Sequence, residues 1–169
     1  GAVPLNGRYH LVGAAGVGMA PLAELLLAMG CHVSGSDRSR DAGQPSARLN
    51  ALEQKGLRVF PQDGTGVDPA QVAVVVSSAI EPDNPDLLAA RRLSVPVLPR
   101  ARLLATLVHG KNCVAVAGTA GKTTVAGMLG YILEQTGRDP TVCTGGAVLN
   151  WLAPDSTGCV RLGSGGPWV

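Results

Sequence analysis

The stretch GTAGKTT (118–124) lies between an apolar run, CVAVA (113–117), and a segment with helical character, VAGMLGYILE (125–134). A glycine-rich turn between a strand and a helix presents main-chain N–H groups and the positive end of the helix to anionic oxygens. The order therefore predicts a phosphate-binding loop, with a buried strand over 113–117 and a helix over 125–134. The pattern is a short variant of the general P-loop, which would have glycine in place of Val116.

The residue types of this loop suggest particular roles. Lys122 would reach the terminal phosphates and act as the catalytic cation, and the Thr123 hydroxyl would bind Mg²⁺, a hard cation that takes oxygen ligands. An ordinary strand-to-helix turn is the alternative, because Gly-Lys-Thr also occurs by chance. The residues expected to bind ATP are Gly118, Thr119, Ala120, Gly121, Lys122, Thr123 and Thr124.

The composition is typical of an α/β protein whose strands are buried on both faces, since hydrophobic residues make up 46%, charged residues only 15%, and there are 23 glycines. An aromatic content of 3% and a net charge of +2 argue against nucleic-acid binding. No apolar run reaches the roughly 18 residues of a membrane span, and no signal peptide pattern is present. We therefore expect a cytoplasmic protein without nucleic-acid or membrane partners.

The cysteines and histidines do not predict a metal site. No C-x-x-C pair is present, and the three histidines lack metal-ligand spacing, so we interpret the histidines as structural or surface residues. Buried free thiols in a reducing cytosol are expected, rather than disulfides, for Cys31, Cys113, Cys143 and Cys159.

A second glycine-rich turn lies near the start of the chain. The stretch GAAGVGM (13–19) follows a predicted strand over 9–12, and Asp37 comes after the next predicted strand, 31–34. Dinucleotide-binding folds place an acid beside a ribose hydroxyl at this spacing of about 20 residues. The dinucleotide pattern would require glycine in place of Ala15, however, and Asp37 could simply cap the following loop.

The continuous β-branched run VAVVV (72–76) is typical of a central parallel strand, and SSAI (77–80) follows it. Ligands of open α/β sheets bind outside the carboxyl ends of the strands, so residues 13–18, Asp37 and residues 77–80 should converge on one edge. Ser77 and Ser78 could instead be polar residues that merely end the strand. Other elements are expected as helices over 22–29, 47–55, 84–92 and 100–108, and as strands over 57–60, 95–98 and 141–144.

The expected fold class is α/β, with two units. A Rossmann-like parallel-sheet domain over 1–108 is followed by the first strand, P-loop, helix and strand of a second α/β domain over 109–169. The short polar connection 109–112 marks the boundary. From Gly145 onward we expect a glycine-rich, loop-like tail.

Taken together, these motifs resemble the Mur ligase family, and the resemblance runs over essentially the whole chain. It implies an N-terminal Rossmann-like domain for a UDP moiety, a central ATPase domain, and a C-terminal domain that helps to bind an amino acid. It also implies an enzyme of bacterial peptidoglycan synthesis that uses ATP and Mg²⁺ to activate a carboxylate as an acyl phosphate, which an amine attacks. The matching stretches are HLVGAAGVGM (10–19), VSGSD (33–37), VVSSAI (75–80), AGTAGKTT (117–124) and DPTVCTGG (139–146).

Within the family, the motifs look most like the ligase that joins L-alanine to UDP-N-acetylmuramate. The second half also looks like the member that recycles murein tripeptide. Two departures are Ala120, where this subfamily usually carries His, and Ala15, where glycine is usual and where a methyl group could crowd the turn. The resemblance implies a UDP-sugar site formed by Gly13, Ala14, Ala15, Gly16, Val17, Gly18, Met19, Ser36, Asp37, Ser77, Ser78, Ala79 and Ile80.

The family's acidic metal-binding segment would begin just after Val169, and the rest of the ATPase domain and the C-terminal domain would follow it. We therefore expect an N-terminal portion of a ligase that is inactive by itself but retains UDP-sugar binding, and that could form a homodimer through exposed strand edges. Two other interpretations remain open. The first turn and Asp37 would fit a nicotinamide-dependent oxidoreductase fragment, and the missing downstream segment would fit a non-catalytic nucleotide-binding module.

Overall fold

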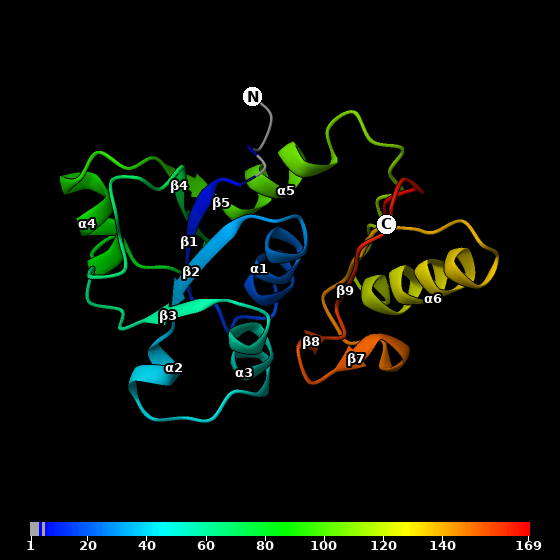
Figure 1. Cartoon of the computed structure of the whole chain (residues 1–169), viewed down its shortest axis with the longest axis horizontal. Coiled ribbons are helices and arrows are strands. Elements are labelled where there is room, and N and C mark those ends of the chain that lie inside the picture. Colours follow the sequence, from blue (N-terminus) through cyan, green and yellow to red (C-terminus); the bar gives the residue numbers. More distant parts are fainter. Residues whose placement is uncertain (1–3, 5) are drawn as a thin grey trace.

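The computed structural model describes residue 4 and residues 6–169. Its first half is a five-stranded sheet with the order β3-β2-β1-β4-β5, in which all neighbouring strands are parallel (Figure 1). This is the strand order of doubly wound nucleotide-binding folds, which confirms the predicted Rossmann-like architecture. The strands are β1 (Arg8–Val12), β2 (His32–Ser36), β3 (Arg58–Phe60), β4 (Ala73–Val76) and β5 (Val97–Pro99).

Helices cover both faces of this sheet. The larger hydrophobic core lies on the face covered by α1, α3 and α5, and a smaller cluster lies under α4 on the other face. A short helix, α2, falls where only a polar loop was expected. The helices are α1 (Met19–Ala28), α2 (Arg38–Asp41), α3 (Ala47–Gln54), α4 (Pro85–Arg92) and α5 (Arg100–Val108).

The helix ends follow the local sequence. Helix α1 ends before Gly30, whose φ of 85° is the left-handed conformation that glycine adopts without strain. Ser46 caps α3, because its hydroxyl accepts a hydrogen bond of 3.2 Å from the N–H of Leu49. Asn84 caps α4, because its side-chain oxygen accepts a hydrogen bond of 3.0 Å from the N–H of Asp86. Pro85 occupies the first turn of that helix.

The second half consists of one long helix and several short elements. The tail after Gly145 is not the loop predicted from sequence, because β6 pairs antiparallel with β9, and β7 with β8. Its elements are α6 (Lys122–Gln135), β6 (Val142–Cys143), the 3-10 turn η1 (Leu149–Trp151), β7 (Leu152–Ala153), β8 (Ser156–Thr157) and β9 (Val160–Arg161).

The predicted buried strand over 113–117 is wrong. Cys113 forms only an isolated bridge with Trp168, and the N–H of Val114 donates to the carbonyl of Trp168 at 2.8 Å. Residues 113–115 are exposed. An apolar, β-branched composition favours a strand, but burial needs neighbouring strands, and the described residues supply one short contact on one side.

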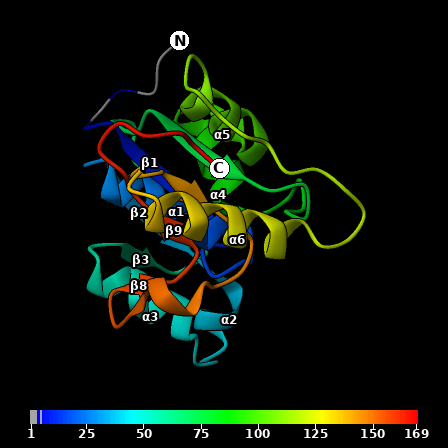
Figure 2. The same cartoon turned by 90° about the vertical axis from the view of Figure 1, so that its right-hand side faces the viewer.

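The two halves pack directly on one another, and Figure 2 shows β8 and β9 lying over α3 and α1. The buried carboxylate of Glu24 in α1 accepts hydrogen bonds from the N–H of Thr157, at 3.1 Å, and from its hydroxyl. Lys55 lies 3.5 Å from the same carboxylate. Cys159 and Trp168 belong to the main core, which therefore extends across the predicted domain boundary. That boundary stays a prediction.

The four cysteines are free in this structure, and they differ in burial. Cys31 and Cys159 are buried and Cys143 is half-buried, whereas Cys113 is exposed because its expected strand does not form. Burial raises the pKa of the Cys143 thiol to about 12, so this thiol is protonated at neutral pH. Within residues 4 and 6–169, no helix is both long and apolar enough to cross a bilayer.

Candidate functional site

The first glycine turn is fastened to the end of β2. The N–H groups of Gly13 and Ala14 both donate to the carbonyl of Ser36, at 2.9 and 3.0 Å. The close approach requires Gly35, because a Cβ there would lie 2.8 Å from the Cβ of Ala14. The turn is thus a rigid extension of the sheet edge.

Asp37 completes this attachment. Its carboxylate accepts a hydrogen bond of 2.8 Å from the N–H of Ala15, and it caps α2 by accepting from the N–H and hydroxyl of Ser39. Three donors occupy most of the roughly four acceptor positions of a carboxylate. These contacts give Asp37 a capping role, one of the two roles that the sequence leaves open for it.

The carboxyl end of β4 meets the same turn, as the strand-edge argument predicts. The side chain of Ile80 lies 3.5 Å from the position that a Cβ on Gly13 would take. Ser77 is half-buried and turns the chain, because its hydroxyl accepts from the N–H of Ala79 at 3.4 Å. Ser78 and Ala79 are exposed. The structure thus brings residues 13–18, Asp37 and residues 77–80 to one edge of the sheet.

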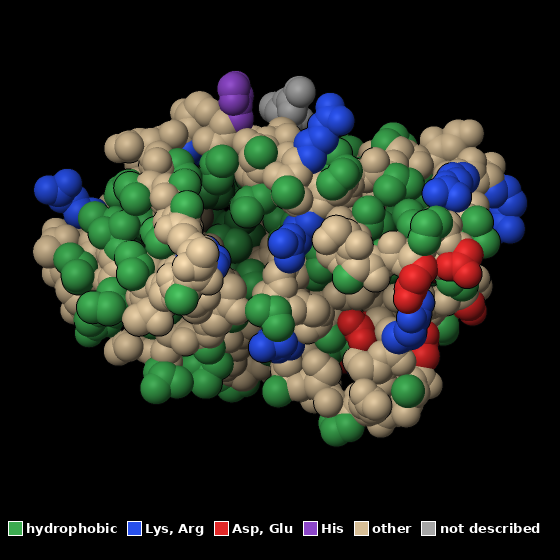
Figure 3. Space-filling model, turned by 180° about the vertical axis from the view of Figure 1, so that it is seen from behind, with side chains coloured by type: hydrophobic (Ala, Val, Ile, Leu, Met, Phe, Trp, Pro, Cys, Tyr) green, Lys and Arg blue, Asp and Glu red, His purple; other side chains and the backbone are tan. Residues whose placement is uncertain are grey.

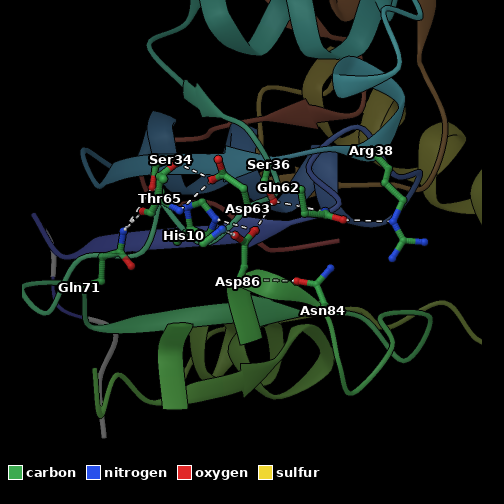
Figure 4. A network of polar contacts seen from close by, with 12 residues as sticks. His10, Ser34, Ser36, Arg38, Gln62, Asp63, Thr65, Gln71, Asn84 and Asp86 are labelled. Carbon is green, nitrogen blue, oxygen red and sulfur yellow. Dashed lines mark hydrogen bonds and ion pairs between the residues drawn. The ribbon is translucent and has the colours of Figure 1, made fainter. Parts of the chain in front are cut away.

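A buried polar network supports this edge from below (Figure 4). The carboxylate of Asp86 accepts from the hydroxyl of Ser36, from the N–H of Gly64 at 2.8 Å, and contacts Nε2 of His10 at 3.3 Å. Burial alone would raise the pKa of Asp86, but these hydrogen bonds outweigh it and hold the pKa below its ordinary value. The network joins β1, β2 and α4, and so fixes the strand end that carries Asp37.

Most N–H groups of the first turn are used within the fold. Gly13, Ala14, Ala15, Gly16 and Met19 all donate to nearby oxygens. Within the part of the chain that the structure describes, the N–H groups of Val17 and Gly18 have no acceptor. Ala15 packs against the main core, so its methyl group does not crowd the exposed surface of the turn.

Beside these two N–H groups lies Arg100, the first residue of α5. Its guanidinium occupies the space over Gly18, where an added Cβ would lie 1.5 Å from Nη1. Arg100 also lines a cavity of about 170 Å³ together with Gly18, Thr144 and Gly145, so this cavity lies between the two halves. Figure 3 shows the rear face of the molecule, which is hollowed near its centre and has basic side chains at the rim of the hollow.

The second glycine turn also has the shape of an anion site. Gly118 and Gly121 have φ values of 152° and 75°, and Gly121 leads directly into α6. For residues 118–124, no main-chain N–H group finds an acceptor among the described residues. These N–H groups and the positive end of α6 fit phosphate oxygens.

Lys122 and Thr123 lie in this turn as expected. The ammonium of Lys122 donates to the carbonyls of Gly118, at 2.6 Å, and Thr119, at 3.3 Å, and thus folds over the loop. Thr123 Oγ1 lies 3.3 Å from the position that a Cβ on Gly145 would take. Within residues 4 and 6–169, no group of three His, Cys, Asp or Glu side chains could hold a metal ion. In this turn, the Thr123 hydroxyl is the side-chain oxygen placed to bind a magnesium ion.

A larger cavity, of about 770 Å³, lies elsewhere. It opens at the amino ends of β1 and β2, where Arg8 and His32 line it, and no expected site residue lies on its wall. The opposite edge of the sheet is the better candidate for the nucleotide site, because parallel sheets bind ligands beyond the carboxyl ends of their strands. The unpaired N–H groups of both glycine turns also lie away from this cavity.

Sequence reasoning missed Arg100 and Asp86. Arg100 was assigned only to the start of a helix, and no sequence spacing links it to a turn 82 positions earlier. The signal for Asp86 was its place after Asn84-Pro85, which predicts a helix start but not a buried carboxylate.

Comparison with known proteins gives a consistent assignment. A family model described as the Mur ligase family, catalytic domain, matches residues 8–112. A UDP-N-acetylmuramate–L-alanine ligase from Rhodopseudomonas palustris (strain TIE-1) is 43% identical over 164 residues, which cover 96% of this chain and 32% of the relative. The chain thus spans about a third of the length of the curated relatives it matches.

Two solved structures resemble the whole described fold. A UDP-N-acetylmuramate-alanine ligase from Thermotoga maritima superposes with a TM-score of 0.83 at 27% identity, over 95% of this chain and 36% of that one. A UDP-N-acetylmuramate:L-alanyl-gamma-D-glutamyl-meso-diaminopimelate ligase from Neisseria meningitides superposes with a TM-score of 0.81 at 26% identity. The match covers 96% of this chain and 51% of that one.

Proposed function

This chain belongs to the Mur ligase family, and on that premise we propose that it is the N-terminal nucleotide-binding portion of a cytoplasmic ligase that joins L-alanine to UDP-N-acetylmuramate. The observation that carries the proposal is the pair of glycine turns with unpaired N–H groups, one at the carboxyl edge of the parallel sheet and one at the start of α6. The 43% identity to an L-alanine ligase over nearly the whole chain supports this choice of substrates.

The first turn is assigned to the UDP-sugar. Its location beyond β1, β2 and β4 is where open α/β sheets bind nucleotides, and the N–H groups of Val17 and Gly18 are available for the diphosphate. Residues 77–80 would form the opposite wall of this site. The remaining residues assigned to it, including Ser36 and Asp37, would act by holding the turn in place.

The second turn is assigned to ATP and Mg²⁺. Lys122 would exchange its carbonyl partners, Gly118 and Thr119, for phosphate oxygens, and the Thr123 hydroxyl would bind the magnesium ion. ATP bound there supplies the phosphoryl group that activates the muramyl carboxylate. The N–H groups of residues 118–124 would hold that phosphate in position and balance its charge, which are the main protein contributions to phosphoryl transfer.

A calorimetric titration tests the proposal. UDP-N-acetylmuramate should give saturable heat with the 169-residue chain, with a dissociation constant below about 1 mM, and circular dichroism should establish that the chain is folded. A folded chain that shows no heat at millimolar ligand contradicts the assignment of the first turn. Enhanced NADH fluorescence on mixing would instead favour an oxidoreductase, which the occupied carboxylate of Asp37 argues against.

A second candidate is a ligase that adds the preformed tripeptide, supported by the TM-score of 0.81 to the enzyme from Neisseria meningitides. Both candidates bind UDP-N-acetylmuramate, so the calorimetric titration does not separate them. A full-length ligase that carries this chain in place of its own first third, assayed with each acceptor, separates them: the proposal expects ATP-dependent turnover with L-alanine. Turnover with the tripeptide alone would favour the second candidate.

A further inference from the structure

The position of Arg100 is set by a contact with the last glycine of the first turn. A Cβ on Gly18 would lie 1.5 Å from Nη1 and 2.6 Å from Cζ, so the guanidinium lies directly against the main chain of Gly18. Gly18 has an ordinary φ of −97°, which any residue adopts. The absence of a side chain at Gly18 leaves the space that the guanidinium occupies, and the backbone conformation itself does not require glycine.

The turn itself supplies no positive side chain. Residues 13–19 are all uncharged, and the nearest charged group fastened to them is the carboxylate of Asp37. The N–H groups of Val17 and Gly18 provide hydrogen bonds, and the start of α1 provides a partial positive charge. A doubly charged diphosphate would need a full positive charge beside those two N–H groups, and Arg100 is located there.

Arg100 is also available for a ligand. Its side chain is half-buried. Within residues 4 and 6–169, its guanidinium donates no hydrogen bond and forms no ion pair with an acidic side chain. The cavity of about 170 Å³ gives it open space bounded on the far side by Thr144 and Gly145. A half-buried guanidinium loses water on burial, so a site that holds it without an acceptor is suited to an incoming anion.

We propose that Arg100 binds the diphosphate of the UDP-sugar, together with the N–H groups of Val17 and Gly18. This inference rests on the proposed function of the first turn. The planar guanidinium can donate two parallel hydrogen bonds to phosphate oxygens, which an ammonium cannot reproduce in the same geometry. Gly18 is then a positioning residue for Arg100, because a side chain there would take the place of the guanidinium.

Calorimetry on the 169-residue chain tests the role of Arg100 in diphosphate binding. The ligands are UDP-N-acetylmuramate, UDP, and uridine, which lacks the diphosphate. Arg100→Gln should weaken binding of both diphosphate ligands by about ten- to a hundredfold and leave uridine binding unchanged. Arg100→Lys should recover part of the loss. Arg102→Gln removes an exposed arginine from the same helix and should bind like the wild type.

Gly18→Ala is an independent variant, since it leaves Arg100 in the sequence but occupies its place. It should reproduce the selective loss of diphosphate binding while thermal unfolding shows a folded chain. Wild-type affinity in a folded Arg100→Gln variant overturns the role of Arg100 and leaves the proposed function intact. A wild-type chain that binds neither UDP nor UDP-N-acetylmuramate overturns both.

Discussion

The carboxylate of Asp37 accepts a hydrogen bond of 2.8 Å from the N–H of Ala15, which joins the turn after β1 to the end of β2. Asp37 is buried, and its other oxygen accepts from the N–H of Ser39 at 3.0 Å. Asp37 lies at the sequence spacing of a ribose-binding acid, and its hydrogen bonds hold the turn against the end of β2. Ala15 fits there because the turn uses its N–H while its methyl group packs on the core.

Replacement of Asp37 by alanine should lower the free energy of unfolding by about 1–3 kcal/mol. The change removes the cap of α2 and leaves the N–H of Ala15 without its acceptor. Urea denaturation followed by circular dichroism measures the loss. Asp83→Ala, at an exposed aspartate, is the matched control and should stay within about 0.5 kcal/mol of the wild type. Equal effects of the two changes would contradict the support role.

Glu24 and Thr157 should be energetically coupled, because their contact joins the two halves of the chain. Glu24→Gln and Thr157→Val should each cost about 1–3 kcal/mol, and the double variant should cost less than the sum by at least about 0.5 kcal/mol. Urea denaturation of all four proteins gives the coupling energy. Strict additivity would mean that this contact does not hold the halves together.

Asp86 should contribute stability that depends on pH. Its folded pKa lies below the unfolded value of about 3.9, so the contribution is present above that value and is lost as the pH falls through the folded pKa. Asp86→Asn should therefore reduce the change in unfolding free energy between about pH 5 and about pH 2. Urea titrations at a series of pH values measure this slope. An unchanged acid dependence would contradict the role of the His10–Asp86 network.

Lys122→Ala should weaken ATP binding by more than about tenfold with little effect on stability, because Lys122 is exposed and its ammonium contacts only carbonyls of its own loop. Equilibrium binding of Mg-ATP and thermal unfolding supply the two measurements. Arg138→Ala removes an exposed cation beyond the opposite end of α6 and should leave ATP binding unchanged. A similar effect of both changes would indicate only a general loss of positive charge.

Local patterns were sufficient to predict much of this fold. The apolar run of β4, the glycine that ends α1 and the Asn-Pro pair at the start of α4 each act through their immediate neighbours. The same is true of the two glycine turns, whose backbone requirements are visible in the sequence. The convergence of residues 13–18 and 77–80 followed from the rule that parallel strands share one carboxyl edge.

The remaining features depend on contacts between distant segments. Residues 113–117 have the composition of a buried strand, but their burial depends on partners elsewhere in the chain. Glu24 lies within an otherwise apolar helix, and only the fold shows that Thr157 donates hydrogen bonds to its carboxylate while Lys55 lies beside it. Arg100 reaches Gly18 because α5 packs beside α1, and no local spacing encodes that neighbour.

Amide-resolved NMR during a titration with UDP-N-acetylmuramate tests the central claim, that the first turn is the UDP-sugar site, most directly. Saturable shift changes are expected, largest at the N–H groups of Val17 and Gly18, which have no acceptor in the described fold. The N–H of Gly137, beyond α6, should not move. Saturable shifts centred on other residues, or none at all from a folded chain, would show that the first turn is not the UDP-sugar site.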